Sequence, residues 1–99
     1  MLKNLAGTWD VKVISGPKWF KSFNLLKDRK IIISNYGYNV TRGISWGGFN
    51  ISRENEIIIL TYIKWPIVDK LTWTNETELS GKFYFKNKYI GNFKMKRKL

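Results

Sequence analysis

The sequence predicts an all-β fold, a small closed or nearly closed antiparallel up-and-down barrel of about eight strands. Turn residues recur about every eight to twelve residues, a spacing typical of barrels and sandwiches. Short stretches between the turns alternate apolar and polar residues, as half-buried strands do. The first and last such stretches, 7–13 and 91–97, could pair with each other. That pairing would close the sheet and remove its open edges.

The first predicted strand covers Gly7–Val13, with Trp9, Val11 and Val13 on one face. The last segment has the same pattern, with Phe93, Met95 and Arg97 on one face. We expect both apolar faces to point into the barrel.

Six further segments are predicted to be extended because apolar residues alternate along them. They are Trp19–Leu26, Ile31–Tyr36, Val40–Trp46 with its continuation through Phe49 and Ile51, Ile57–Trp65, Asp69–Thr74 and Glu78–Lys86, and the last strand is expected to span Tyr89–Lys98. The Gly47-Gly48 pair permits a bulge or bend in the third of these. Loops and turns are expected at residues 15–18, 27–30, 36–39, 53–56, 75–77 and 87–88. A single helical turn over Met1–Leu5 is expected to plug one barrel end.

The chain has 99 residues, which indicates one domain spanning 1–99. It contains no Cys and no His, so we expect no disulfide, no thiolate nucleophile, no metal site and no cofactor. Carboxylate pairs at spacing two, Glu54 with Glu56 and Glu76 with Glu78, could serve acid–base chemistry. Both pairs fall in predicted turns, where acids are usually solvated. The sequence therefore predicts a protein without enzymatic activity and without catalytic residues.

The longest apolar runs, 31–33 and 57–60, are the length of strands and too short to span a membrane. The first residues lack the apolar segment of a signal peptide. We therefore expect a cytoplasmic protein, or a secreted one if a leader has been removed.

The segment Leu5–Val11 resembles the Gly-x-Trp opening of the lipocalins and of the wider calycin group. The segments 79–83 and 91–97 are similar to the ending of short bacterial lipocalin-like domains. The resemblance implies a calycin-like barrel in which Trp9 closes the base and Arg97, from the last strand, packs over it. Such a contact would be a cation–π interaction.

A barrel mouth suits an apolar or amphipathic ligand when the interior is not filled. Arg42 shares a predicted face with Trp46. If that face points inward, Arg42 needs an anionic partner such as a ligand carboxylate or phosphate; otherwise it reaches solvent. Large rings near loops could contact a ligand or simply fill the core. The candidate ligand-binding residues are Tyr36, Tyr38, Arg42, Trp46, Trp65 and Trp73.

The formal net charge is +11, which points to an anionic partner or to a solubility device. From Lys82 onward the chain has basic residues and no acid, and one sheet face would carry a lysine ladder. Its members are Lys82, Lys86, Lys94, Lys96 and Lys98. This face could attract phosphates or an acidic protein, or it could be a solvated outer surface.

The sequence thus predicts a non-catalytic binding protein and leaves three kinds of partner open. The first is a small amphipathic or anionic ligand at the barrel mouth. The second is a protein partner, with the barrel acting through loops and its basic surface, as small calycin-like protease inhibitors do. The third is a nucleic acid attracted by the lysine ladder.

Overall fold

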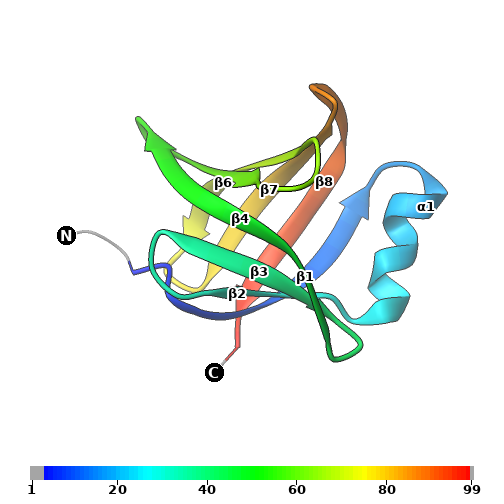
Figure 1. The fold of residues 1–99 in the computed structure, drawn as a ribbon, viewed down its shortest axis with the longest axis horizontal. Coiled ribbons are helices and arrows are strands. Elements are labelled where there is room, and N and C mark those ends of the chain that lie inside the picture. Colours follow the sequence, from blue (N-terminus) through cyan, green and yellow to red (C-terminus); the bar gives the residue numbers. More distant parts are fainter. Residues whose placement is uncertain (1–3, 99) are drawn as a thin grey trace.

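The computed structural model describes residues 4–98 and forms a closed barrel in which each strand pairs with the next and β8 returns to β1 (Figure 1). The predicted eight-stranded up-and-down barrel is confirmed. The strands are β1 Gly7–Ser15, β2 Arg29–Ile32, β3 Tyr36–Thr41, β4 Ile44–Glu54, β5 Ile57–Tyr62, β6 Ile67–Asn75, β7 Glu78–Phe85 and β8 Lys88–Arg97.

Closure of the barrel depends on the antiparallel pairing of β1 with β8. Trp9 lies opposite Arg97, and Val13 lies opposite Phe93. Trp9 is fully buried and donates its indole N–H to the carbonyl of Leu5 at 2.9 Å. Inward-facing apolar side chains from every strand except β3 pack around the barrel axis or line its mouth, so the interior is mostly filled.

The segment Trp19–Leu26 is not a strand, and that prediction is wrong. Residues Lys18–Lys21 form the short helix α1, and Ser22–Leu26 form a 3-10 helix, η1. A helical turn brings Phe20 and Phe23 to the same side, since they are three residues apart. Phe20 stacks on Phe83 with ring centroids 4.6 Å apart, and Phe23 stacks on Trp46 at 6.4 Å. Two helical turns therefore cover one end of the barrel, beside β1.

The predicted loop at 36–39 is also wrong, because Tyr36–Thr41 is strand β3. The tight turn lies instead at Arg42-Gly43, where both residues have positive φ, so Val40–Trp46 is a hairpin and not one strand. The charged segment 27–30 is only partly a turn, since β2 begins at Arg29. Gly37 does not mark a turn. It sits on the inner face opposite Phe49, where a side chain would collide with the Phe49 ring.

The bulge expected at Gly47-Gly48 is confirmed. Three residues of β3, from Gly37 to Asn39, run opposite four residues of β4, from Phe49 back to Trp46, so β4 holds one extra residue. Gly47 has φ of 62°, and a Cβ there would lie 2.8 Å from the Asn39 amide nitrogen. The bulge therefore lets Asn39 turn its side chain into the barrel.

Two further predicted strand boundaries, at the end of β5 and the start of β6, differ from those in the structure. β5 ends at Tyr62 and not at Trp65, and β6 begins two residues early, at Ile67. Of the helical turn expected over Met1–Leu5, residues 1–3 lie outside the described residues. Residues 4–6 are not helical, but Leu5 is buried and joins the core. No helix within residues 4–98 is both long enough and apolar enough to cross a membrane.

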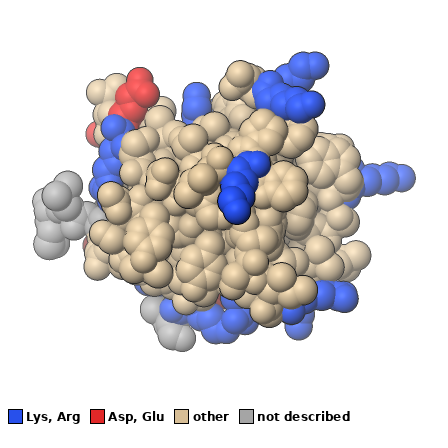
Figure 2. All heavy atoms as spheres, viewed as in Figure 1, with Lys and Arg blue, Asp and Glu red and all other residues tan. Residues whose placement is uncertain are grey.

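Charge is distributed unevenly over the outside of the barrel. Figure 2 shows basic side chains projecting from most of the outline, whereas the visible acidic side chains gather mainly near the end of β4. The charged side chains on this face are therefore mainly basic, and they project from a largely uncharged surface.

Candidate functional site

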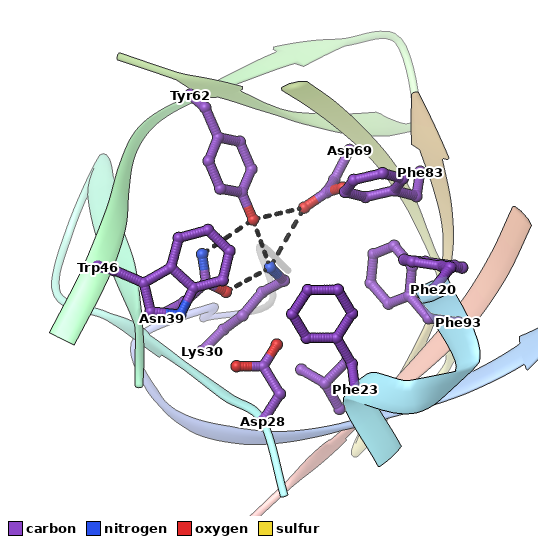
Figure 3. Close-up of a pocket in the computed structure, with 11 residues that line it drawn as sticks. Phe20, Phe23, Asp28, Lys30, Asn39, Trp46, Tyr62, Asp69, Phe83 and Phe93 are labelled. Atoms are coloured by element: carbon purple, nitrogen blue, oxygen red, sulfur yellow. Dashed lines mark hydrogen bonds and ion pairs between the residues drawn. The ribbon is translucent and has the colours of Figure 1, made fainter. Parts of the chain in front are cut away.

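The clearest candidate site is a chamber inside the barrel mouth, next to α1 and η1 (Figure 3). Its cavity has a volume of about 30 Å³. Polar groups converge at its centre and aromatic rings surround them. The chamber is lined by Val11, Phe20, Phe23, Asp28, Lys30, Asn39, Trp46, Tyr62, Asp69, Phe83 and Phe93.

Four different strands place the polar groups of the chamber. Each group occupies an inward-facing position that the alternation of its strand would ordinarily give to an apolar residue. Lys30 precedes Ile32 on the inner face of β2, and Tyr62 follows Leu60 on that of β5. Asp69 lies between Ile67 and Leu71 on β6, and Asn39 comes from β3. Closure of the barrel brings these four side chains together.

Lys30 is the centre of the network. Its ammonium group lies 2.7 Å from the side-chain oxygen of Asn39, 2.7 Å from the hydroxyl of Tyr62 and 3.3 Å from Oδ2 of Asp69. Tyr62 in turn donates its hydroxyl to Oδ2 of Asp69 at 3.2 Å. Asn39 donates its amide to Tyr62 at 3.0 Å and to the carbonyl of Gly47 at 3.2 Å. Lys30 is only 4% exposed and Asp69 is fully buried.

All the side-chain donors of the network have acceptors, but one acceptor in it has no donor. A lysine ammonium has three N–H donors, and Lys30 faces three acceptors. Asp69 Oδ1, in contrast, is buried and has no hydrogen-bond donor among the described residues. Buried polar atoms are rarely left without a partner, and leaving one so costs about 1–3 kcal/mol. The chamber therefore favours an incoming group that donates hydrogen bonds.

A second carboxylate, Asp28, lies at the edge of the chamber. Thr41 donates its hydroxyl to Oδ1 of Asp28 at 2.7 Å, and the indole N–H of Trp46 donates to Thr41 at 2.7 Å. When both carboxylates are ionised, the chamber contains two negative charges, on Asp28 and Asp69, and one positive charge, on Lys30. Its net charge is then −1. Asp28 is nearly buried, and one carboxylate offers more acceptor sites than this contact uses.

Burial shapes the pKa values of these groups. Desolvation raises the pKa of Asp28. This rise is only partly offset by the charge of Lys30 and by hydrogen bonds from Thr41 and the backbone of Arg29. Desolvation also raises the pKa of Asp69 and of Tyr62. Burial alone would lower the pKa of Lys30, but Tyr62, Asp69 and Asp28 raise it above its ordinary value, so Lys30 stays charged.

Aromatic rings complete the chamber. The Lys30 ammonium lies 5.3 Å from the centroid of the Tyr62 ring, 5.5 Å from that of Phe49 and 5.7 Å from that of Phe93. The Tyr62 ring meets the ammonium through its hydroxyl edge, whereas the rings of Phe49 and Phe93 can stabilise the cation through their π systems. The stacked pairs Phe20–Phe83 and Phe23–Trp46 border the side nearest the helical segment.

Of the six ligand-binding residues predicted from the sequence, Trp46 lines the chamber. Trp46 also borders a separate outer groove, together with Tyr38 and Trp65. Tyr36 is exposed on β3, and Arg42 is exposed in the β3–β4 turn, outside the linings of both the chamber and this groove. Trp73 packs edge-on against Trp9, with ring centroids 5.9 Å apart, and belongs to the core.

The predicted structural pair is present. The guanidinium carbon of Arg97 lies 4.4 Å from the centroid of the Trp9 ring. Arg97 also donates to the carbonyls of Ala6 and Asn4, so it ties the N-terminal segment to the barrel end.

The predicted lysine ladder is divided between several places. Lys82 and Lys94 line a groove on the outer sheet face. Lys96 lies opposite Glu78 and Asp10 on neighbouring strands. Lys86 sits over the ring of Phe85 at the β7–β8 turn, and Lys98 follows the end of β8.

Sequence reasoning missed Lys30, Asn39, Tyr62 and Asp69 as site residues. A signal was present for Asp69, because it alternates with Ile67 and Leu71, and for Tyr62, which alternates with Leu60 and Ile58. A polar residue at an inward position of an otherwise apolar strand indicates a buried partner.

No group of three or more acidic side chains within residues 4–98 is arranged to hold a metal ion. No protein-family model, curated protein or solved structure matches this chain. The closed eight-stranded barrel is compatible with a calycin-like fold, and membership of that group stays a prediction.

Proposed function

We propose that this barrel is a non-enzymatic receptor for a small protonated amine, whose ammonium group enters the chamber beside Asp69 and Asp28. The observation that carries the proposal is Asp69 Oδ1, a buried acceptor without a donor among the described residues. An ammonium group would supply that donor and would also balance the second carboxylate. Hydrogen bonds to charged groups contribute about 1.5–3 kcal/mol each.

The donor–acceptor balance supports a cation over an anion. The three donors of Lys30 are already engaged, and Tyr62 and Asn39 direct their donors at groups within the protein. An anion entering the chamber would meet two carboxylates and no free donor among the described lining side chains. The anionic ligand predicted from the sequence therefore fits this chamber less well than a cation does.

The size of the cavity limits what can enter. A volume of about 30 Å³ accommodates groups the size of one or two water molecules, which is the size of an ammonium group. The hydrocarbon part of the ligand would lie against the rings of Phe23 and Trp46, at the side of the chamber bordered by η1. An amphipathic amine matches this combination of acidic and aromatic surfaces.

The proposal can be tested by isothermal titration calorimetry at neutral pH with n-butylamine, n-butanol and butyrate. We expect n-butylamine to bind and butyrate not to bind. Asp28→Asn should weaken n-butylamine binding about tenfold or more, because it removes one negative charge from the chamber while keeping its shape.

The matched control is Asp10→Asn, the same chemical change on an exposed side chain that pairs with Arg29 outside the barrel. This variant should bind n-butylamine like the unmodified protein. Equal weakening by both variants, or preferential binding of butyrate, would contradict the proposal.

A further inference from the structure

A groove of about 400 Å³ crosses the outer face of the sheet over β6, β7 and β8. It is a different pocket from the chamber inside the barrel, although Phe93 borders both. Its lining includes Lys70, Lys82 and Lys94 together with Thr72, Ser80 and Tyr84. Among these described lining residues three are lysines and none is acidic.

The lysines of the groove are neighbours across the strands. Lys70 on β6 lies directly opposite Lys82 on β7. Lys94 on β8 lies opposite Ser80 on one side and opposite Lys12 of β1 on the other. Like charges that face each other across a sheet are destabilising. A row of such pairs lowers stability unless an anion lies across it.

The remaining polar groups of the groove suit phosphate oxygens. Thr72, Ser80 and Asn92 offer hydroxyl and amide donors beside the lysines. Phosphate contacts of this kind come mostly from Lys, Arg, Ser, Thr and Asn side chains.

Tyr84 adds an aromatic ring on the outer face. It points away from the core because its neighbour Phe83 points inward, and Lys70 lies 5.0 Å from the centroid of its ring. The ring of Tyr89 packs edge-on against it at 5.8 Å. A basic groove that also presents a ring is the usual combination for single-stranded nucleic acid, because the lysines follow the backbone and a base stacks on the ring.

We infer that the Lys70–Lys82–Lys94 groove binds single-stranded nucleic acid, with the phosphodiester backbone on the lysines and a base on Tyr84. A flexible single strand can follow a groove of this size, whereas a duplex is stiff over about 50 nm. The expected binding is electrostatic and tolerant of sequence.

The test uses fluorescence anisotropy with a labelled oligothymidylate at several salt concentrations. The double variant Lys70→Gln/Lys82→Gln should weaken binding and flatten the dependence of log K on log salt by about 1.4, since each phosphate contact on a single strand contributes about 0.7. The double variant Lys21→Gln/Lys27→Gln loses the same net charge from exposed positions beside η1 and should keep the slope.

Tyr84→Leu should weaken binding about fivefold or more at constant salt slope, as loss of one stacked base predicts. Several results would overturn the inference: no binding at low salt, equal loss in both lysine variants, tighter binding of a duplex, or equal binding of polyglutamate. The groove variants should bind n-butylamine unchanged, so failure here is distinguishable from failure of the amine receptor.

Discussion

The two carboxylates of the chamber differ in what balances their charge. Asp69 has Lys30 at 3.3 Å and also accepts from Tyr62. Breaking a buried ion pair from one side typically costs 3–5 kcal/mol, so Asp69 is tied to the fold. Asp28 accepts from Thr41 and lies outside that pair, so it can be changed alone. Asp28 is therefore the better residue for separating binding from stability.

Asp28→Asn is expected to stabilise the protein at pH 7. Burial raises the pKa of Asp28 above its ordinary value of 3.8, which means that the folded state prefers the protonated form. The free energy of unfolding therefore falls as pH rises from that ordinary value through the raised one. Asparagine does not ionise and can still accept from Thr41. We expect a gain of about 0.5–2 kcal/mol in urea unfolding at pH 7.

The gain should disappear in acid, where Asp28 itself is protonated in both the folded and the unfolded state. Asp10→Asn provides the comparison, because Asp10 is exposed and pairs with Arg29 at the surface. A loss of stability at pH 7 in Asp28→Asn, or a gain that persists unchanged in acid, would contradict this interpretation. Asp28→Asn is also expected to weaken amine binding. One substitution would then raise the free energy of unfolding and lower the affinity for the ligand.

At the scale of elements, α1 and η1 form the cover of the chamber. Phe20 fills the space between the helix and the barrel wall, and it is almost fully buried against Phe83. Leu25 of η1 points outward and is 79% exposed. The cover is therefore attached mainly through its phenylalanine rings.

Phe20→Ala is expected to lower the free energy of unfolding by about 3–5 kcal/mol, because it leaves a cavity under the helix. The control is Leu25→Ala in the same segment, which should change stability by no more than about 0.5 kcal/mol. Urea unfolding followed by tryptophan fluorescence measures both. Similar losses in the two variants would show that the cover is not held by the buried ring.

The same elements explain where sequence reasoning failed. Residues 19–26 carry apolar groups on both faces of a strand pattern, and two helical turns are too short to display a helical period. The spacing of Phe20 and Phe23 fits one face of a helix equally well. Gly37 suggested a turn, but it is a small residue on an inward strand position opposite Phe49. Local pattern did not distinguish these possibilities, and tertiary packing decides between them.

The candidate site was harder to predict than the fold for a related reason. Lys30 and Asp28 stand in a run of four charged residues, 27–30, which is typical of a solvated turn. Only the register of β2 against β1 and β3 turns Lys30 inward. Its partner Asp69 is thirty-nine residues away in sequence, counting from 30 to 69. A contact at that separation depends on closure of the whole barrel.

At the scale of the whole molecule, closure was the most predictable feature. The matched alternation at the two ends of the chain indicated that β1 and β8 pair, and the contact of Trp9 with Arg97 follows from that register. Closure also accounts for the chamber. Inward positions of a small barrel converge on its axis, so polar residues on β2, β3, β5 and β6 meet although they are distant in sequence.

The whole molecule also separates its charges. The excess of basic residues behind the formal net charge of +11 lies outside the chamber, which contains two carboxylates and one lysine. Lysines on the outside attract anions, and the excess of acceptors on the inside favours a cation. One small barrel can therefore offer two binding sites, an outer one for anions and an inner one for a cation.

The most direct test of the amine chamber is NMR titration of the side-chain carboxyl carbons with and without n-butylamine. A bound ammonium group favours the ionised form of a neighbouring carboxylate. We predict that n-butylamine lowers the pKa of Asp28 and of Asp69, whereas the carboxyl signal of the exposed Asp10 does not respond to n-butylamine. Unchanged pKa values at both chamber carboxylates at saturating n-butylamine would contradict the account.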